Sequence, residues 1–123
     1  MEARKKIASL GPNPSDEDLH RVRILTKRAR YAAEAAADPL DDRRVEFANR
    51  AADVQDALGE LQDAVTAQVT IERLVARERR PGVAMAAGRL LERELSAAAE
   101  ARTAWAKPWS KLDNKKLVAW MKN

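Results

Sequence analysis

The sequence predicts an all-α protein, an antiparallel bundle of about four helices. Alanine is the commonest residue, and the 123 residues include only four glycines and five prolines, so helix formers outnumber helix breakers. Apolar residues recur at spacings of three and four, whereas β-branched residues never form an alternating run. No linker divides the chain. We therefore expect one domain over residues 1–123, with residues 1–14 as a short helix and turn leading in.

The first two predicted helices are separated by a turn. Residues 2–10 have the composition of a short helix, and Gly11-Pro12-Asn13-Pro14 ends it. Ser15 begins a capping-box pattern, with acidic residues in the first turn that complement the helix dipole. We therefore expect the second helix to run from Asp16 to Ala37.

A long helix is expected next, from Pro39 to Glu78, with Asp38 as its N-cap. Its first apolar positions alternate in steps of four and three, which is typical of a helix packed against neighbours. Gly59 lies within this pattern and indicates either a kink or a close helix crossing. The apolar seam comprises Phe47, Ala51, Val54, Leu58, Leu61, Val65, Val69, Ile71, Leu74 and Val75.

Arg80-Pro81-Gly82 ends the long helix, and a third helix follows. Lys107-Pro108-Trp109 should interrupt that helix, and a short terminal helix is expected from Leu112 to Met121. Because the core is rich in alanine, each helix buries little area, and we expect the bundle to need a further partner. The face that the third helix should bury consists of Val83, Ala87, Leu90, Leu91, Leu95, Ala98 and Trp105.

Composition excludes several classes of protein. The absence of cysteine excludes disulfides, thiolate metal sites and cysteine nucleophiles, and it is typical of a cytoplasmic protein. No apolar run reaches the roughly 18 residues that a membrane span requires. A share of 46% hydrophobic residues argues against disorder. We therefore expect a cytoplasmic protein that does not contact a membrane.

Charge is distributed unevenly along the chain, whose net charge is +4. Residues 1–31 carry 8 basic and 4 acidic side chains, residues 32–79 carry 6 and 11, and residues 80–123 carry 9 and 4. The three segments therefore contribute +4, −5 and +5. Two basic segments that flank an acidic one favour a local positive surface and a polyanionic partner.

One face of the second predicted helix carries a row of cationic side chains. At about 100° per residue they fall within a sector roughly 80° wide, which we call the basic stripe. Tyr31 borders the basic stripe, and Arg21 and Arg28 project from a separate flank. The basic stripe consists of His20, Arg23, Lys27 and Arg30. The residues expected to seat the helix in the bundle are Val22, Leu25, Ala29, Ala32 and Ala33.

The spacing of the basic stripe favours an extended ligand. Its members lie at successive turns, roughly 5 Å apart along the helix axis. Like charges one turn apart repel by a few tenths of a kcal/mol per pair, so the row lowers stability. Arginine binds phosphate oxygens through two N–H groups, and lysine adds a point charge. A linear chain of phosphates therefore suits the basic stripe better than a compact ligand does.

A purely structural interpretation is also open. A basic helix face is often only solvated, or paired with acidic residues of a neighbouring helix. A lone histidine such as His20 is, by itself, more often structural than functional. The carboxylates that could neutralise the basic stripe are Glu34, Asp53, Asp56, Glu60 and Asp63.

Two motifs in this chain resemble those of a known family. Residues 19–31 (LHRVRILTKRARY) resemble the second-half signature of CHAD domains, the conserved histidine α-helical domains. Residues 54–64 (VQDALGELQDA) resemble the Leu-Gln-Asp-x-Leu-Gly-x-x-x-Asp stretch of the same family. Residues 109–112 are similar to its closing helix. The chain therefore resembles the C-terminal half of a CHAD domain.

The resemblance implies two similar helical bundles whose basic helices line a positive channel for inorganic polyphosphate. CHAD domains also localise to polyphosphate granules, so granule association is expected. Since this chain resembles only one half, a missing N-terminal half or a second copy is expected to complete the channel. By position, the resemblance implies that the ligand is faced by His20, Arg23, Lys27 and Arg30. It places at the edges of the binding site Arg21, Arg28 and Tyr31.

Other kinds of function find less support in the sequence. With one histidine, no cysteine and no glycine-rich phosphate loop, we expect a non-enzymatic module without a cofactor. Asp56 and Asp63 lie two turns apart but are too few for a Mg²⁺ site, so we expect no metal. Nucleic-acid binding is the alternative, although the tryptophans lie far in sequence from the basic stripe. A purely structural oligomerisation module is the third possibility.

Overall fold

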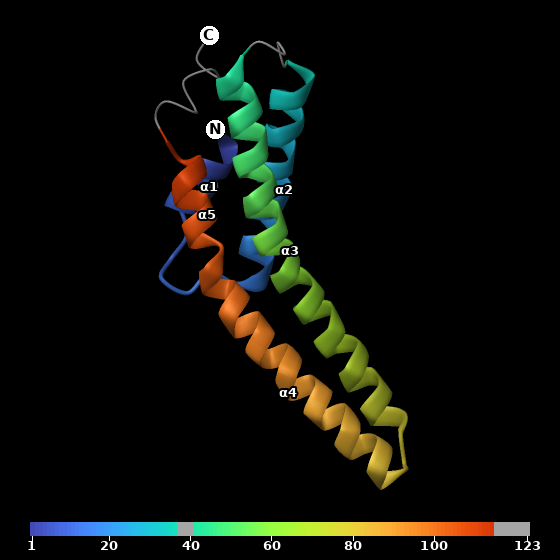
Figure 1. The fold of residues 1–123 in the computed structure, drawn as a ribbon. Coiled ribbons are helices and arrows are strands. Elements are labelled where there is room, and N and C mark those ends of the chain that lie inside the picture. The colour runs from blue at the N-terminus through green and yellow to red at the C-terminus, as the bar shows by residue number, and fades with distance from the viewer. Residues whose placement is uncertain (37–40, 115–123) are drawn as a thin grey trace.

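The computed structural model describes residues 1–36 and 41–114. Over these ranges the chain forms helices and no strand, which confirms the predicted all-α class. The helices are α1 (Glu2–Ala8), α2 (Asp16–Ala35), α3 (Asp42–Arg77), α4 (Pro81–Ala104) and α5 (Ala106–Leu112). Figure 1 shows two parts, a bundle and a hairpin that projects from it. We define the hairpin as residues 66–97 of α3 and α4, and the bundle as the remaining described residues.

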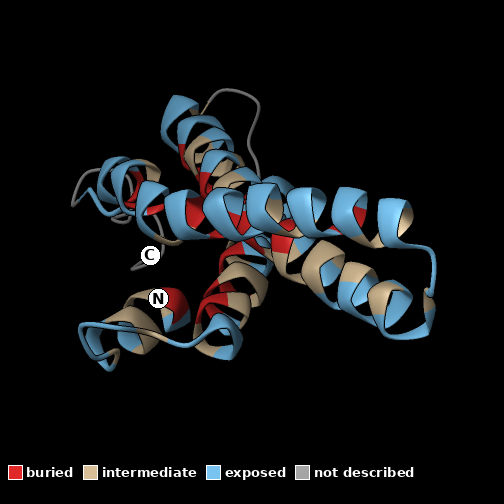
Figure 2. Cartoon of the chain, turned by 90° about the horizontal axis from the view of Figure 1, so that it is seen from below, coloured by how far each residue is buried: buried red, intermediate tan, exposed pale blue. Residues whose placement is uncertain are grey.

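The hydrophobic core lies in the bundle, where α3 packs against α2, α4 and α5 (Figure 2). The predicted apolar seam of the long helix is confirmed from Phe47 to Leu61, because each of its residues is buried. α1 packs on α2, and its Ala3 joins the same core. The largest fully buried side chains are Phe47, Leu19, Leu58, Leu112, Val22, Val54 and Thr26.

The hairpin does not bury the faces that the sequence predicts. Leu74 is 56% exposed, Leu90 is 50% exposed and Leu95 is 44% exposed. In the hairpin each helix has only the other as a neighbour, so one narrow line of each helix is covered (Figures 1 and 2). On α4 that line runs through Ala87 and Ala98, with Leu90 and Leu95 on either side of it. The prediction of one continuous buried face is therefore wrong for the hairpin.

The start of α2 has the predicted cap. The Ser15 hydroxyl accepts a hydrogen bond from the Asp18 backbone N–H at 3.0 Å, and the Ser15 N–H donates to the Asp18 carboxylate at 3.3 Å. Lys6 of α1 also forms an ion pair with Asp18 at 3.0 Å. These contacts satisfy N–H groups that would otherwise lack a partner at the helix start.

The long helix begins later than predicted. α3 starts at Asp42, and Asp41 caps it by accepting a hydrogen bond from the Arg43 backbone N–H at 3.2 Å. The predicted start at Pro39 is therefore wrong, because an aspartate directly before the helix provides the cap. Asp38 and Pro39 lie outside the described residues.

The break between α4 and α5 also differs from the prediction. It falls at Trp105, whose indole N–H donates to the Arg102 carbonyl at 3.0 Å. Pro108 lies in the first turn of α5, where a missing backbone N–H leaves no intrahelical bond unmade. The terminal helix does not begin at Leu112, where α5 ends, and residues 115–123 lie outside the described part of the chain.

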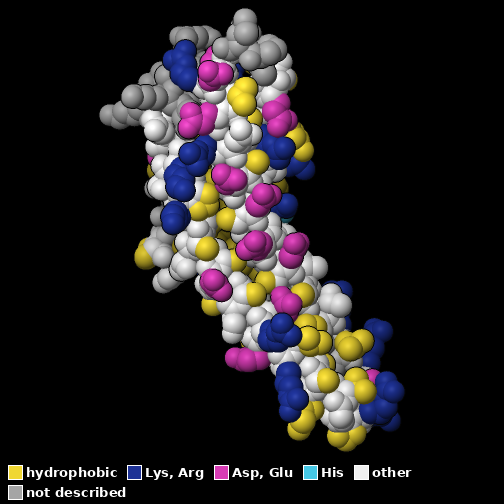
Figure 3. Space-filling model, in the orientation of Figure 1, with side chains coloured by type: hydrophobic (Ala, Val, Ile, Leu, Met, Phe, Trp, Pro, Cys, Tyr) yellow, Lys and Arg dark blue, Asp and Glu magenta, His cyan; other side chains and the backbone are white. Residues whose placement is uncertain are grey.

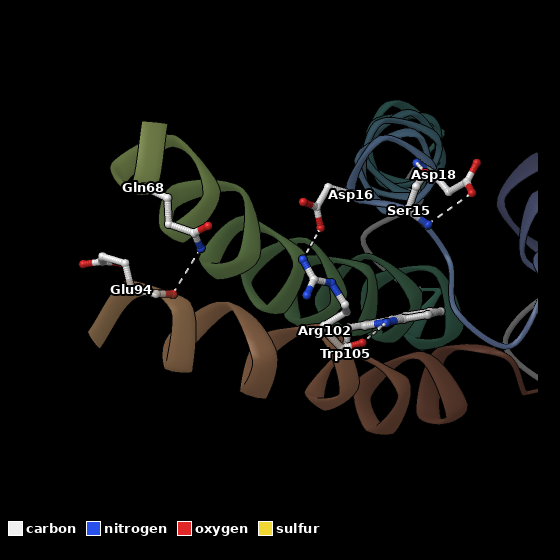
Figure 4. Close-up of polar contacts among 7 residues, drawn as sticks. All are labelled: Ser15, Asp16, Asp18, Gln68, Glu94, Arg102 and Trp105. Atoms are coloured by element: carbon white, nitrogen blue, oxygen red, sulfur yellow. Dashed lines mark hydrogen bonds and ion pairs between the residues drawn. The ribbon is translucent and has the colours of Figure 1, made fainter. Parts of the chain in front are cut away.

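Two polar contacts hold α4 against the other helices (Figure 4). Arg102 forms an ion pair with Asp16 in the first turn of α2. Farther along, the Gln68 side-chain amide donates to the Glu94 carbonyl at 3.3 Å. The first contact joins α4 to the bundle, and the second joins the two helices of the hairpin.

Candidate functional site

The residues that seat α2 are largely those that the sequence predicts. Val22, Leu25 and Ala33 are buried and Ala29 is half-buried, but Ala32 is exposed, so that prediction is wrong. Ala32 lies at the edge of the sector that the buried residues of α2 occupy. Sequence reasoning also missed Thr26, which is fully buried and donates its hydroxyl hydrogen to the Val22 carbonyl at 2.8 Å.

The basic stripe lies along the junction of α2 and α3. Arg23 and Arg30 both reach Gln55 of α3, and His20 lines a hollow together with α3 side chains. Three members of the basic stripe, His20, Arg23 and Arg30, are half-buried, and Lys27 is exposed. The two sequence motifs therefore meet in space, because residues 54–64 supply the surface on which the basic stripe rests.

Arg23 crosses α3 at Gly59. A Cβ atom at Gly59 would lie 3.4 Å from the Arg23 guanidinium, and the Arg23 Nε–H donates to the Gln55 carbonyl at 3.5 Å. α3 continues as a helix through this position. Of the two possibilities that the sequence left open, the contact with Arg23 shows a close approach between α2 and α3 at Gly59. Figure 1 shows that α3 also changes direction in its middle.

Arg30 has two partners that orient it. Its Nε forms an ion pair with Glu34 at 2.9 Å, and its Nη1 donates to the Gln55 side-chain oxygen at 3.1 Å. The buried Gln55 thus contacts two arginines of the basic stripe, one through its backbone and one through its side chain. Sequence reasoning did not select Gln55, although it lies in the second motif beside the buried Val54.

His20 lies at the start of the basic stripe, in a hollow between α2 and α3. Asp16 and Glu17 of α2 line this hollow, and its α3 wall consists of Leu58, Leu61, Gln62 and Val65. The Nδ1 atom of His20 is enclosed and has no hydrogen-bond partner among the described residues. His20 is therefore placed between an apolar wall and two carboxylates.

The remaining predicted site residues are exposed. The Lys27 ammonium lies 5.7 Å from the centre of the Tyr31 ring, and Tyr31 is 51% exposed. Arg21 and Arg28 lie on the flank toward α1, as the separate-flank prediction requires, since Arg21 shares a hollow with Lys6 and Arg28 shares one with residues 1–2. Neither arginine forms an ion pair with another residue of the described ranges.

The acidic residues of α3 do not neutralise the basic stripe. Of the carboxylates considered from the sequence, Glu34 alone forms an ion pair with it among the described residues. The α3 line that meets the basic stripe is uncharged and consists of Ala48, Ala52, Gln55, Gly59 and Gln62. The carboxylates occupy the next line of α3, which is exposed and consists of Asp53, Asp56, Glu60 and Asp63.

Two further properties bear on the chemistry of this surface. Within residues 1–36 and 41–114, no group of three histidine, aspartate or glutamate side chains is placed to hold a metal ion. No helix in the same ranges is both long and apolar enough to cross a membrane. The basic stripe, which lies beside the uncharged line of α3, offers cationic hydrogen-bond donors, and these suit an anionic ligand.

Comparison with known families supports the interpretation of the motifs. A family model described as the CHAD domain matches residues 1–72, which include α1, α2 and most of α3. Both motifs lie inside the match, whereas residues 109–112 lie outside it, so their similarity to a closing helix stays a prediction. No curated protein and no solved structure matches the chain.

Proposed function

Because this chain belongs to the CHAD domain family, we propose that it binds inorganic polyphosphate along α2. The observation that carries the proposal is that most cationic side chains of α2 have no ion-pair partner among the described residues. Five arginine and lysine side chains lie between residues 21 and 30, and Arg30 alone forms an ion pair among the described residues. A helix with this many uncompensated charges gains stability when an anion lies beside it.

Each member of the basic stripe has a distinct role in this proposal. The terminal nitrogens of Arg23 make no hydrogen bond to the described residues, so they are free to bind phosphate while Nε stays on Gln55. Arg30 is held at two points, by Glu34 through Nε and by Gln55 through Nη1. Because both arginines are already oriented, binding loses less side-chain entropy. Lys27 adds an exposed charge between them, and His20 lies at one end of the basic stripe.

The edge residues extend the surface. Arg21 and Arg28 are exposed on the α1 side, where they can contact a second phosphate of a chain that bends around α2. Tyr31 lies at the other end of the basic stripe, beside Lys27. We propose that the module acts by binding alone, without catalysis, cofactor or metal, and that it associates with polyphosphate granules in the cytoplasm. A second basic wall would come from an N-terminal half or from a second copy.

Calorimetric titration with long-chain polyphosphate tests the proposal. Arg23→Ala/Arg30→Ala should weaken binding by at least about tenfold, because two charge-assisted contacts are lost. The matched control is Arg89→Ala/Arg93→Ala, which removes the same charge from the hairpin and should change affinity less than about twofold. Equal binding by parent and Arg23→Ala/Arg30→Ala, with unchanged helicity, would show that the site assignment is wrong.

A competition experiment with single-stranded DNA distinguishes polyphosphate binding from nucleic-acid binding. Trp105 and Trp109 are both only 8% exposed and lie in the core of the bundle, so neither is available to stack on bases. Tyr31 is then the only exposed aromatic side chain among the described residues, so single-stranded DNA of matched charge should displace polyphosphate poorly at moderate salt. Equal displacement would indicate a general polyanion-binding surface instead.

A further inference from the structure

α3 carries a second seam, on the side that faces solvent. Its residues alternate in steps of three and four, so they stay on one face of the helix. All are exposed except the half-buried Ala67. We call this face the outer seam; it consists of Asp53, Asp56, Glu60, Asp63, Ala67, Thr70, Leu74 and Arg77.

The two ends of the outer seam have opposite charge. Residues 53–63 contain four carboxylates and no basic residue, whereas residues 73–80 contain four arginines and one glutamate. Figure 3 shows acidic side chains together with basic ones over the bundle part of this view, and mainly basic and apolar side chains toward the tip of the hairpin. None of the four carboxylates, and neither Arg73 nor Arg77, forms an ion pair with another described residue.

The basic end of the outer seam is also hollowed. The hollow is lined by Thr70, Arg73, Leu74, Arg77 and Glu78, all on or directly after the last turns of α3. Leu74 is 56% exposed there, between two arginines. An apolar contact flanked by two cations suits a helix that presents carboxylates at the same spacing.

We propose that the outer seam binds a second copy of this chain, with the two α3 helices antiparallel about a two-fold axis near Ala67 and Thr70. Glu60 and Arg77 are equally far in sequence from the midpoint between Ala67 and Thr70. Glu60 of one copy therefore pairs with Arg77 of the second copy, and the reverse pair forms as well. Asp63 then lies opposite Leu74 and beside Arg73 of the second copy. Small residues at the centre let the helices approach closely.

A second copy fits this face because the helix is complementary to itself. A two-fold interface requires the same surface to supply both halves of each contact, and the outer seam contains both. A separate acidic helix would cover the arginines but would repel the carboxylates of residues 53–63. Since the contacts are exposed ion pairs around one helix face, the dimer should be weak and sensitive to salt.

Sedimentation velocity of the full chain, without polyphosphate, tests this dimer independently of the proposed function. The parent should dimerise at about 50 mM NaCl, and its association constant should fall by at least about tenfold at about 500 mM. Arg73→Glu/Arg77→Glu and Glu60→Arg/Asp63→Arg should each be monomeric, because like charges then face each other. An equimolar mixture of the two variants should form heterodimers, since one seam is then acidic and the other basic.

The matched control is Arg89→Glu/Arg93→Glu, which makes the same charge change on α4, in a hollow lined by α4 residues. This variant should dimerise like the parent. The proposal is overturned if the parent is monomeric at low salt, if either seam variant dimerises like the parent, or if the mixture of seam variants stays monomeric. Because heterodimers form only from folded chains, the mixture also excludes misfolding as the cause of the monomeric state.

Discussion

The two halves of α3 differ in how many neighbours cover them. Residues 42–64 belong to the bundle, where α2, α5 and the end of α4 surround the helix, whereas beyond Val65 the helix runs beside α4 alone (Figure 1). Apolar residues recur every three or four positions in both halves. Phe47 is fully buried in the first half, and Leu74 is 56% exposed in the second.

This difference shows what hydrophobic periodicity does and does not specify. Apolar residues that recur in steps of three and four positions define a line on a helix that can be buried. They do not define how many neighbouring helices cover that line. In the bundle the line from Phe47 to Leu61 meets three helices. In the hairpin Val69 and Leu74 are exposed, because they lie about 140° apart around α3 and neither is on the line that faces α4.

The largest expected effect comes from truncating one apolar side chain in each half of α3 and comparing the two variants. Phe47→Ala should lower the free energy of unfolding by about 3–5 kcal/mol, because it removes a fully buried aromatic side chain. Leu74→Ala should change it by no more than about 0.5 kcal/mol, because this side chain is mostly exposed. Urea denaturation followed by circular dichroism measures both. Similar losses in the two variants would mean that the hairpin is covered as well as the bundle.

Replacing either of two glycines within helices by alanine should change the free energy of unfolding by an intermediate amount. Outside its own helical turn, Gly88 of the hairpin has no atom within 4 Å of the position that a Cβ would occupy. Gly88→Ala should therefore stabilise the protein by about 0.5–1 kcal/mol through helix propensity. At Gly59 a Cβ would meet the Arg23 guanidinium at 3.4 Å, which is contact with the end of a flexible side chain, so Gly59→Ala should not destabilise the protein. The same denaturation experiment measures both variants. A loss of stability in Gly59→Ala would mean that Arg23 cannot move aside from the position of the added Cβ.

The smallest expected effect is a pH dependence of stability. The hydrogen bond from Lys6, followed by that from Ser15, holds the pKa of Asp18 below its ordinary value. A lowered pKa in the folded state adds stability above the ordinary pKa, and this stability is lost as pH falls through the folded value. Asp18→Asn should therefore lower Tm at neutral pH, and its difference from the parent should shrink in acid.

The hairpin provides the control for this pH dependence. Hydrogen bonds from Arg80 hold the pKa of Glu78 below its ordinary value as well, but the two residues are only two positions apart. A local pair of this kind persists in part in the unfolded chain, so Glu78→Gln should change Tm less than Asp18→Asn. Thermal melts from neutral to acidic pH compare the two variants. An equal or larger effect of Glu78→Gln would contradict this reasoning.

Part of the candidate site could be predicted from the sequence, and part could not. The basic stripe is predictable because its four members share one face of a helix that is capped by Ser15. Gln55 and Gly59 could not be assigned to the site in the same way. Their roles depend on contacts with Arg23, which lies more than thirty residues away in the chain. No local sequence pattern predicts which distant side chain will pack across a given glycine.

The sequence by itself determined the helical class, the capped start of α2, the alignment of the basic stripe and the motifs of the CHAD family. Each of these depends on residues within a few turns of one another, where spacing and propensity decide the outcome. Only the tertiary structure decided that α3 leaves the bundle after Val65 and that Gln55 anchors two arginines. It also decided that the uncharged line of α3, and not the acidic one, meets the basic stripe. Packing between distant helices sets these features, because neighbours, and not periodicity, determine what a helix face meets.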